Sequence, residues 1–485
     1  MNNYKAVQML KGMTKKELSR FEKFLLSPFY NNDEKLLELF KVLEKHFPSF
    51  SSPEFNKKSI YKIIYGIEKY SDQKLRKLFS GFYKMAEKFL VAISLEENPF
   101  EYDKFLLSEL DSRKIDNLFL LKYNDTINSL NDSGFHYQTF LNYFFLKWLY
   151  TSYHLDRGEQ YKVPPVIFER TEQLIFFFLS DLFLSITDIE TNEREFNYFH
   201  HDNLPGHFID NINLESIYNY IQQHDYKNKE LFSMYYYSFL MKKNFDNESY
   251  FFKLKNLVED NLSRLTIHGK MNFILRLISY CNQKTRLNYN DKFESLKLDL
   301  YETYIRYELY KVNGNYFRTD TFFYLFTTYL DNHKISEAAN FLEKNIKSIN
   351  PAHSKNIISL CKSLLLFERG KYIESLSEAS MVKSSIMFIK IDLRKLLLKI
   401  NYELNDYDDN KDALNYFNHF LSLAKSIEEK KKNHLKDFAE LYFELIKLKI
   451  NNSDEMIFKK LNRGIENIID LKDKEWFKKK IEEII

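Results

Sequence analysis

The stretch FERGKYIESLSEA, residues 367–379, carries the feature that decides the fold, a glycine turn between two helical segments. Gly370 ends an apolar-periodic run, and Tyr372 and Ser375 follow it at helical spacing. Because glycine tolerates a left-handed backbone, it can close the first helix and let Tyr372 start packing on the second. The stretch therefore predicts a helical hairpin whose repeat turn is formed by Gly370 and Tyr372.

Two neighbouring turns repeat this arrangement. The turn at His333 is followed by a small residue at Ala338, and the turn at Asn405 is followed by Tyr407. The steps from His333 to Gly370 and on to Asn405 are 37 and 35 residues. Repetition at this length is typical of stacked helical hairpins.

The spacing and the small residues resemble the tetratricopeptide repeat over residues 318–425. In that family the small residue lets the two helices of a hairpin approach, and stacked hairpins form a superhelix with a concave binding face. The third copy departs from the pattern, because Asp408-Asp409-Asn410 is inserted before Ala413. The resemblance implies an α-solenoid of helical hairpins.

The opening of the chain resembles a second group, the uncharacterised helical proteins of Bacteroidota. The similar residues are 15–25, then Ser27-Pro28-Phe29-Tyr30-Asn31, then 70–76. This resemblance implies an N-terminal module followed by repeats, and it carries no assigned function.

The composition extends the helical prediction to the whole chain. Among 485 residues there are 10 glycines and 8 prolines, so the residues that commonly form turns and interrupt helices are scarce. Period-two alternation is nowhere sustained, whereas apolar residues recur at helical spacing. The expected fold class is all-α. No transmembrane helix is expected, since the apolar run at 174–186 is too short and contains Asp181.

Helix signals and loop signals divide the chain into regions. The best helix start is Thr14, which can cap a helix while Glu17 reaches back to it. We expect long loops at 131–134, 157–165 and 200–206. The expected regions are a small N-terminal helical domain at 1–96, divergent helical hairpins at 100–310, and the tetratricopeptide-like repeats at 311–485.

The sequence contains no recognisable catalytic or cofactor motif. The glycines form no GxGxxG or GxxxxGK[ST] pattern, and GxSxG and HExxH are absent. Cys281 and Cys361 lack the spacing of a disulfide framework or a thiolate metal site. We therefore expect a non-enzymatic protein with no catalytic residue, no cofactor and no metal.

The densest histidine group is His200, His201 and His207, with Asp202 between them. Imidazole nitrogens and a carboxylate at this range are ligands that zinc accepts. A polar interhelical loop that contains histidines is the simpler interpretation, and no metal site is predicted there.

A basic stripe lies on the helix expected from Asp72 to about Leu95. At 100° per residue, Leu75, Leu78, Phe79, Phe82, Met85, Ala86 and Phe89 share one face, whereas Lys74, Lys77, Lys84 and Lys88 share another face with Gly81. With the helix expected at 57–65, residues 52–95 look similar to the helix-turn-helix of winged-helix regulators. No β-rich wing follows, and the stripe has no arginine, asparagine or glutamine side chain that could form paired hydrogen bonds with the edge of a base. A solvated lysine face is the simpler interpretation.

These observations favour a scaffold that binds a protein or peptide partner on the concave face at about 310–450. The alternative is a DNA-binding regulator that uses residues 52–95 to bind and the repeats to sense or dimerise. Homo-oligomerisation through the concave face is a further alternative. The net charge of +3 gives no global attraction to nucleic acid or membrane. Residues 1–13 lack the apolar core of a secretory signal, and a cytoplasmic location is expected.

Overall fold

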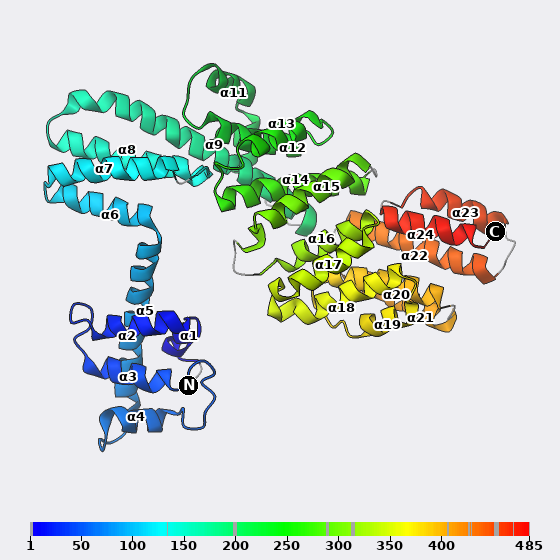
Figure 1. Ribbon diagram of the computed structural model, residues 1–485, viewed down its shortest axis with the longest axis horizontal. Coiled ribbons are helices and arrows are strands. Elements are labelled where there is room, and N and C mark those ends of the chain that lie inside the picture. The colour runs from blue at the N-terminus through cyan, green and yellow to red at the C-terminus, as the bar shows by residue number, and fades with distance from the viewer. Residues whose placement is uncertain are drawn as a thin grey trace. The chain divides into compact units, whose positions relative to one another are not determined.

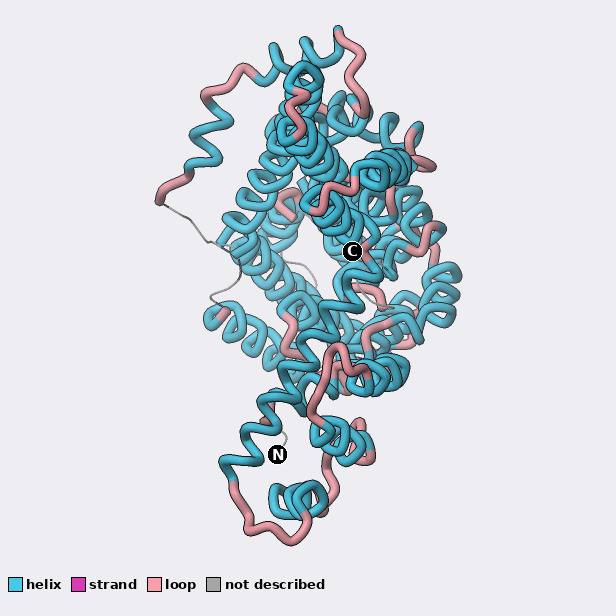
Figure 2. The backbone as a smooth tube through the Cα atoms, turned by 90° about the vertical axis from the view of Figure 1, so that its left-hand side faces the viewer, coloured by secondary structure: helices cyan, strands magenta, loops and turns pink. Residues whose placement is uncertain are grey.

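The computed structural model describes residues 3–132, 134–196, 201–287, 291–311, 316–404, 407–424, 427, 429–450, 455–468 and 470–484. Over these residues the regular secondary structure is helical, and no strand is present (Figure 1 and Figure 2). This confirms the all-α prediction. No helix in the same residues is both long enough and apolar enough to cross a bilayer.

The described part of the chain forms α-helices of 7 to 34 residues. In chain order they are α1 (Lys5–Lys11), α2 (Lys15–Leu26), α3 (Glu34–Glu44), α4 (Lys57–Tyr65), α5 (Asp72–Glu97), α6 (Pro99–Ser112), α7 (Asp116–Asp132), α8 (Tyr137–Asp156), α9 (Val163–Phe196), α10 (Leu204–Asp210), α11 (Leu214–Gln223), α12 (Lys229–Lys243), α13 (Ser249–Asp260), α14 (Ile267–Leu287), α15 (Asp291–Arg306), α16 (Thr319–Asp331), α17 (Ile335–Asn345), α18 (Pro351–Glu368), α19 (Tyr372–Ser380), α20 (Met387–Glu403), α21 (Tyr407–Leu423), α22 (Glu429–Ile450), α23 (Glu455–Ile465) and α24 (Leu471–Glu482). The chain divides into two compact units, residues 1–130 with 145–163, and residues 131–144 with 164–485.

The first unit contains a phenylalanine-rich core at its N-terminal end. Helices α1 to α4 each contact α5, and Figure 1 shows these blue helices gathered around it. Phe21 is fully buried, and its ring meets Phe40 and Phe82 edge-on at centroid distances of 5.7 and 5.4 Å. The seven apolar residues predicted to share one face of α5 are all buried, which confirms that face.

The start of α2 follows directly from its sequence. Thr14 Oγ1 accepts a hydrogen bond from the Glu17 amide at 3.2 Å, and Glu17 Oε2 accepts one from the Thr14 amide at 2.6 Å. These reciprocal bonds satisfy amides that have no partner inside the helix. The hydrogen bonds from Thr14 also hold the pKa of Glu17 below its ordinary value. The predicted capping box is confirmed.

The second unit is built largely from consecutive helix pairs. Contacts join α12 to α13, α14 to α15, α16 to α17, α18 to α19, α20 to α21 and α22 to α23. Helix α16 also contacts α18, and α18 contacts α20, so the first helices of three successive pairs pack side by side. The predicted small residues Ala338 and Ser375 are fully buried. Small buried side chains let the paired helices approach closely.

All three predicted loops are wrong in extent. The loop predicted at 131–134 begins later, because α7 ends at Asp132; residue 133 lies outside the described residues. The loop predicted at 157–165 ends sooner, because α9 begins at Val163 and includes Pro164 and Pro165. Proline fits the first turn of a helix, where its missing N–H would have no partner. The loop predicted at 200–206 also ends sooner, since α10 begins at Leu204; residue 200 lies outside the described residues.

The turns at His333 and Gly370 have the same geometry. Both residues have positive φ, 56° and 71° respectively. After His333 the amide of Lys334 donates to the Tyr329 carbonyl at 2.9 Å, and after Gly370 the amide of Lys371 donates to the Leu366 carbonyl at 2.9 Å. Each turn therefore ends its first helix by the same six-residue capping bond. The turn predicted at Asn405 lies outside the described residues.

Opposite substitutions at these two turns should have opposite effects. Gly370→Val should destabilise the second unit by roughly 1–2 kcal/mol, because a β-branched residue is strained at positive φ. A Cβ atom at Gly370 would meet no atom within 4 Å, so the cost comes from the backbone alone. His333→Gly should instead stabilise by about 0.5 kcal/mol, since relief of strain exceeds the added entropy of the unfolded chain.

Urea unfolding and hydrogen exchange would measure both effects. Loss of protection in Gly370→Val should spread to the flanking hairpins, because neighbouring pairs share one core. Unchanged protection across residues 333–425 would show that the proposed repeat register is wrong.

Candidate functional site

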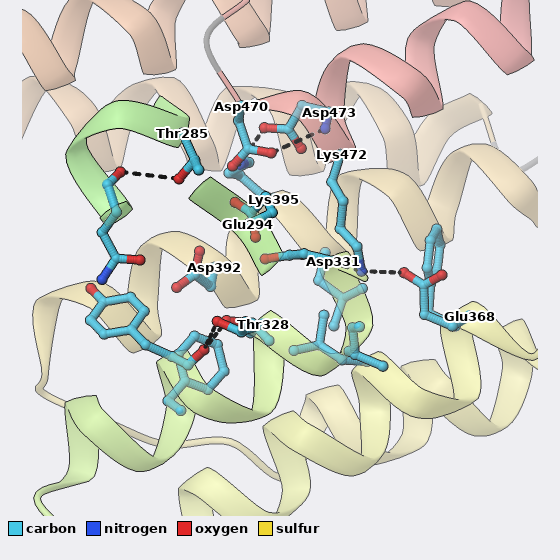
Figure 3. A pocket seen from close by; sticks show the side chains of 18 of the residues that line it. Thr285, Glu294, Thr328, Asp331, Glu368, Asp392, Lys395, Asp470, Lys472 and Asp473 are labelled. Carbon is cyan, nitrogen blue, oxygen red and sulfur yellow. Dashed lines mark hydrogen bonds and ion pairs between the residues drawn. The ribbon is translucent and has the colours of Figure 1, made fainter. Parts of the chain in front are cut away.

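A cavity of about 240 Å³ in the second unit is the candidate functional site (Figure 3). Between residues 316 and 404, every lining residue lies on α16, α18 or α20, the first helices of three successive pairs. Helices α17 and α19 contribute none. Residues of α14 and α15 line another side, and the first turn of α24 closes the cavity with Asp470, Lys472 and Asp473.

Charged side chains dominate the lining. Six of the lining residues are acidic and four are basic, so the described lining has an excess of two negative charges. The acidic residues are Glu294, Asp331, Glu368, Asp392, Asp470 and Asp473, and the basic residues are Lys297, Lys395, Lys399 and Lys472. Several of these charged side chains are poorly exposed, and they need partners, because desolvation of an unpaired charge is costly.

One group of ion pairs joins α20 to α24. Lys395 pairs with Asp473 and lies 3.3 Å from Asp470, while Lys399 lies 2.8 Å from Asp473. The Asp473 side chain is only 5% exposed. Burial lowers the pKa of Lys395, but the carboxylates of Asp470, Asp473 and Asp392 outweigh burial and hold that pKa above its ordinary value. The four side chains therefore form a charged cluster that ties the start of α24 to α20.

Three further ion pairs lie around the cavity, and Lys472 makes two of them. Lys472 Nζ lies 3.0 Å from Glu368 and 3.6 Å from Asp331, so it bridges the C-terminal ends of α18 and α16. Lys297 lies 2.8 Å from Glu294 on the next turn of α15, and both side chains are buried. Lys472 shows directly that this cavity accommodates a lysine ammonium between carboxylates.

Asp392 differs from the other acidic residues of the lining, all of which make ion pairs. It makes no ion pair within 4 Å with any described residue, and Figure 3 shows it apart from the paired side chains. Burial raises the pKa of Asp392 to about 6, although Lys395 and Lys431 oppose the rise. Burial likewise raises the pKa of Asp331 to about 6. A cation entering the cavity would stabilise the ionised form of both groups.

Sequence reasoning did not find this site. Its carboxylates and lysines come from helices that are far apart in the chain, and no local motif joins them. One signal was present in α20, where Ile389, Ile391, Leu396, Leu398 and Ile400 are buried and point in several directions. A helix that is apolar on most sides has little solvent face, so its charged residues must face a cavity or a partner.

The basic stripe on α5 is partly neutralised. Lys74, Lys77, Lys84 and Lys88 are all exposed, but Lys74 pairs with Glu68 at 2.7 Å. The glycine gap is not open, because a Cβ atom at Gly81 would lie 3.5 Å from Leu36 Cδ2 on α3. The stripe offers less positive charge and less room for a phosphate backbone than the sequence pattern indicates.

The remaining sequence candidates do not form a metal site in the described residues. His200 lies outside them, and among them no three histidine, cysteine, aspartate or glutamate residues are placed to hold a metal ion. Cys281 and Cys361 are buried, free thiols. Burial raises the pKa of Cys281 to about 12 and that of Cys361 well above its ordinary value, which keeps both thiols protonated.

Comparison with protein-family models, with curated proteins and with solved structures finds no match to this chain. The resemblances to the tetratricopeptide repeat and to helical proteins of Bacteroidota therefore stay predictions. The fold and the site define an all-α protein with paired helices and a charged cavity, which is lined by α14, α15, α16, α18, α20 and the start of α24.

Proposed function

We propose that this protein is a non-enzymatic scaffold that binds a protein partner through a basic peptide segment. The segment would lie over the cavity between α16, α18 and α20, and one of its lysine or arginine side chains would pair with Asp392. The observation that carries the proposal is that, between residues 316 and 404, the cavity is lined by the first helices of three successive pairs and by neither of the second helices α17 and α19. Stacked helical hairpins use the face made by such helices to bind peptides.

The sign of the charge supports a cationic side chain. The lining has two more carboxylates than lysines, and Asp392 has no ion-pair partner among the described residues. Lys472 already occupies the space between Asp331 and Glu368. An incoming cation therefore has its strongest interaction at Asp392, where it would compensate a desolvated carboxylate.

Selection from a random peptide library displayed on phage would test the proposal. Peptides that bind the full chain should be enriched in lysine or arginine, and Asp392→Asn should weaken them about tenfold, a typical loss for one charged contact. Asp412→Asn is the matched control, because Asp412 is an exposed residue of α21 outside the cavity. Failure to enrich basic peptides, or equal binding by both variants, would overturn the proposal.

Binding of such a peptide should strengthen with rising pH. Asp331 and Asp392 have pKa values raised to about 6, so both are mostly neutral at pH 5 and mostly ionised at pH 7. The ionised fraction of one such group rises about tenfold over that interval, and affinity should rise by a similar factor. Fluorescence anisotropy of a selected peptide would measure it. Asp392→Asn should flatten the profile, and an unchanged profile would assign the pH dependence to another group.

A further inference from the structure

A second cavity, of about 390 Å³, lies in the second unit, and α14 contributes residues to the lining of both cavities. It is lined by His136, which precedes α8, and by residues of α9, α12 and α14. None of its lining residues belongs to the cavity of α16, α18 and α20. Its volume is in the range of pockets that enclose small molecules, about 300–1,000 Å³.

The charge of this second cavity has the opposite sign. Arg276 and Lys242 are its basic residues, and Asp188 is its single acidic residue among the described lining. His136 and His268 also line it, with ring centroids 6.4 Å apart. Burial, with a smaller effect of His268, lowers the pKa of His136 to about 4, so this ring is neutral at pH 7. The described lining therefore has an excess of one positive charge.

Arg276 is fixed in place with part of its guanidinium unused. Its Nε donates to Asn272 Oδ1 at 2.9 Å, and its Nη2 lies 3.4 Å from Asp188 Oδ1. The Arg276 side chain is 16% exposed, whereas Asp188 is 69% exposed and so compensates the buried cation weakly. Nη1 has no hydrogen-bond partner among the described residues.

An unpartnered hydroxyl lies in the same lining. Ser238 is 3% exposed, and its Oγ has no hydrogen-bond partner within the described residues. A buried hydroxyl without a partner is costly, so it points to a ligand or a water molecule that completes it. Ser238 and Lys242 are four residues apart on α12, so both side chains project from one face of the helix.

We propose that this cavity binds a small molecule through an oxyanion, a carboxylate or phosphate group, held by Arg276, Lys242 and Ser238. A planar guanidinium and an ammonium recognise both anions by charge-assisted hydrogen bonds. The neutral His136 ring and the hydroxyl of Ser238 supply uncharged donors or acceptors beside them. This inference is independent of the peptide-binding proposal, because the two cavities share no residue.

Isothermal titration of the full chain with inorganic phosphate and, separately, with succinate would test the inference and distinguish the two anions. Chloride at the same ionic strength is the reference. Saturable one-site binding of either anion supports the site, and Arg276→Gln should weaken it at least about tenfold. Ser238→Ala should weaken it by a smaller factor, since it removes one neutral hydrogen bond with little change of volume.

Lys253→Met is the matched control, because Lys253 is an exposed residue of α13 that does not line the cavity. It should leave binding unchanged. Far-ultraviolet circular dichroism would establish that each variant is folded. Binding of neither anion to the wild-type chain would overturn the inference, as would equal losses in Ser238→Ala and in the Lys253 control.

Discussion

Asp473→Ala should destabilise the second unit by about 3–5 kcal/mol, because it leaves two poorly exposed lysines without their shared partner. Asp473 pairs with Lys395 and Lys399, whose side chains are 14% and 12% exposed. Among the described residues, Asp470 would be the carboxylate left within 4 Å of Lys395. The loss should appear first as release of α24, since this cluster ties that helix to α20.

A double-mutant cycle gives the sharpest form of this test. Lys395→Met in the Asp473→Ala background removes one of the two lysines that have lost their partner. The double variant should therefore lose less unfolding free energy than the sum of the losses in the two single variants. Trp476 lies on α24 and is buried, and its fluorescence in urea would report the unfolding of this end of the chain. Glu475→Ala is the control, an exposed residue of the same helix, and should change stability by less than about 0.5 kcal/mol. Additive losses would mean that the ion pairs are not coupled.

Ser375→Leu should cost the hairpin of α18 and α19 about 3 kcal/mol or more. Ser375 and Ser363 are fully buried, and each hydroxyl donates to the carbonyl of the other residue at 2.7 Å. Leucine would remove the hydrogen bond that the Ser375 hydroxyl donates, and it would force three extra carbon atoms into a contact that only small side chains fit. Ser375→Ala should cost less, about 1–2 kcal/mol, because it removes the hydrogen bond donated by Ser375 without the overpacking.

The comparison between the two substitutions separates packing from hydrogen bonding. Ser377→Leu is the control, since it is the same serine-to-leucine substitution at an exposed position of the same helix. Hydrogen exchange across α18 and α19 would locate the damage. Equal stability of the Ser375→Leu and Ser377→Leu variants would contradict the close approach of the two helices.

Local sequence determined the helices and much of their orientation. Thr14 and Glu17 set the start of α2, the apolar spacing after Ser71 set the buried face of α5, and Gly370 supplied a left-handed turn. Each of these features depends on residues within a few positions of one another, where backbone geometry and side-chain period act directly. The misplaced loop at 157–165 has the same origin, because Pro164 and Pro165 fit either a loop or the first turn of α9.

Only the tertiary structure decided where the charged residues lie. The charged residues of the cavity come from several different stretches of chain. In the sequence, each of these residues looks like part of a solvent-exposed helix face; examples are Glu294, Asp331, Asp392, Lys395 and Asp473. Helical period gives the direction of a side chain relative to its own helix, but it does not say whether solvent or another helix stands opposite. The packing of α16, α18, α20 and the start of α24 encloses these residues and shifts the pKa values of Asp331 and Asp392. Lys395 and Asp473 lie 78 positions apart in the chain, and a single sequence does not reveal their contact, because charges interact through space and not along the chain.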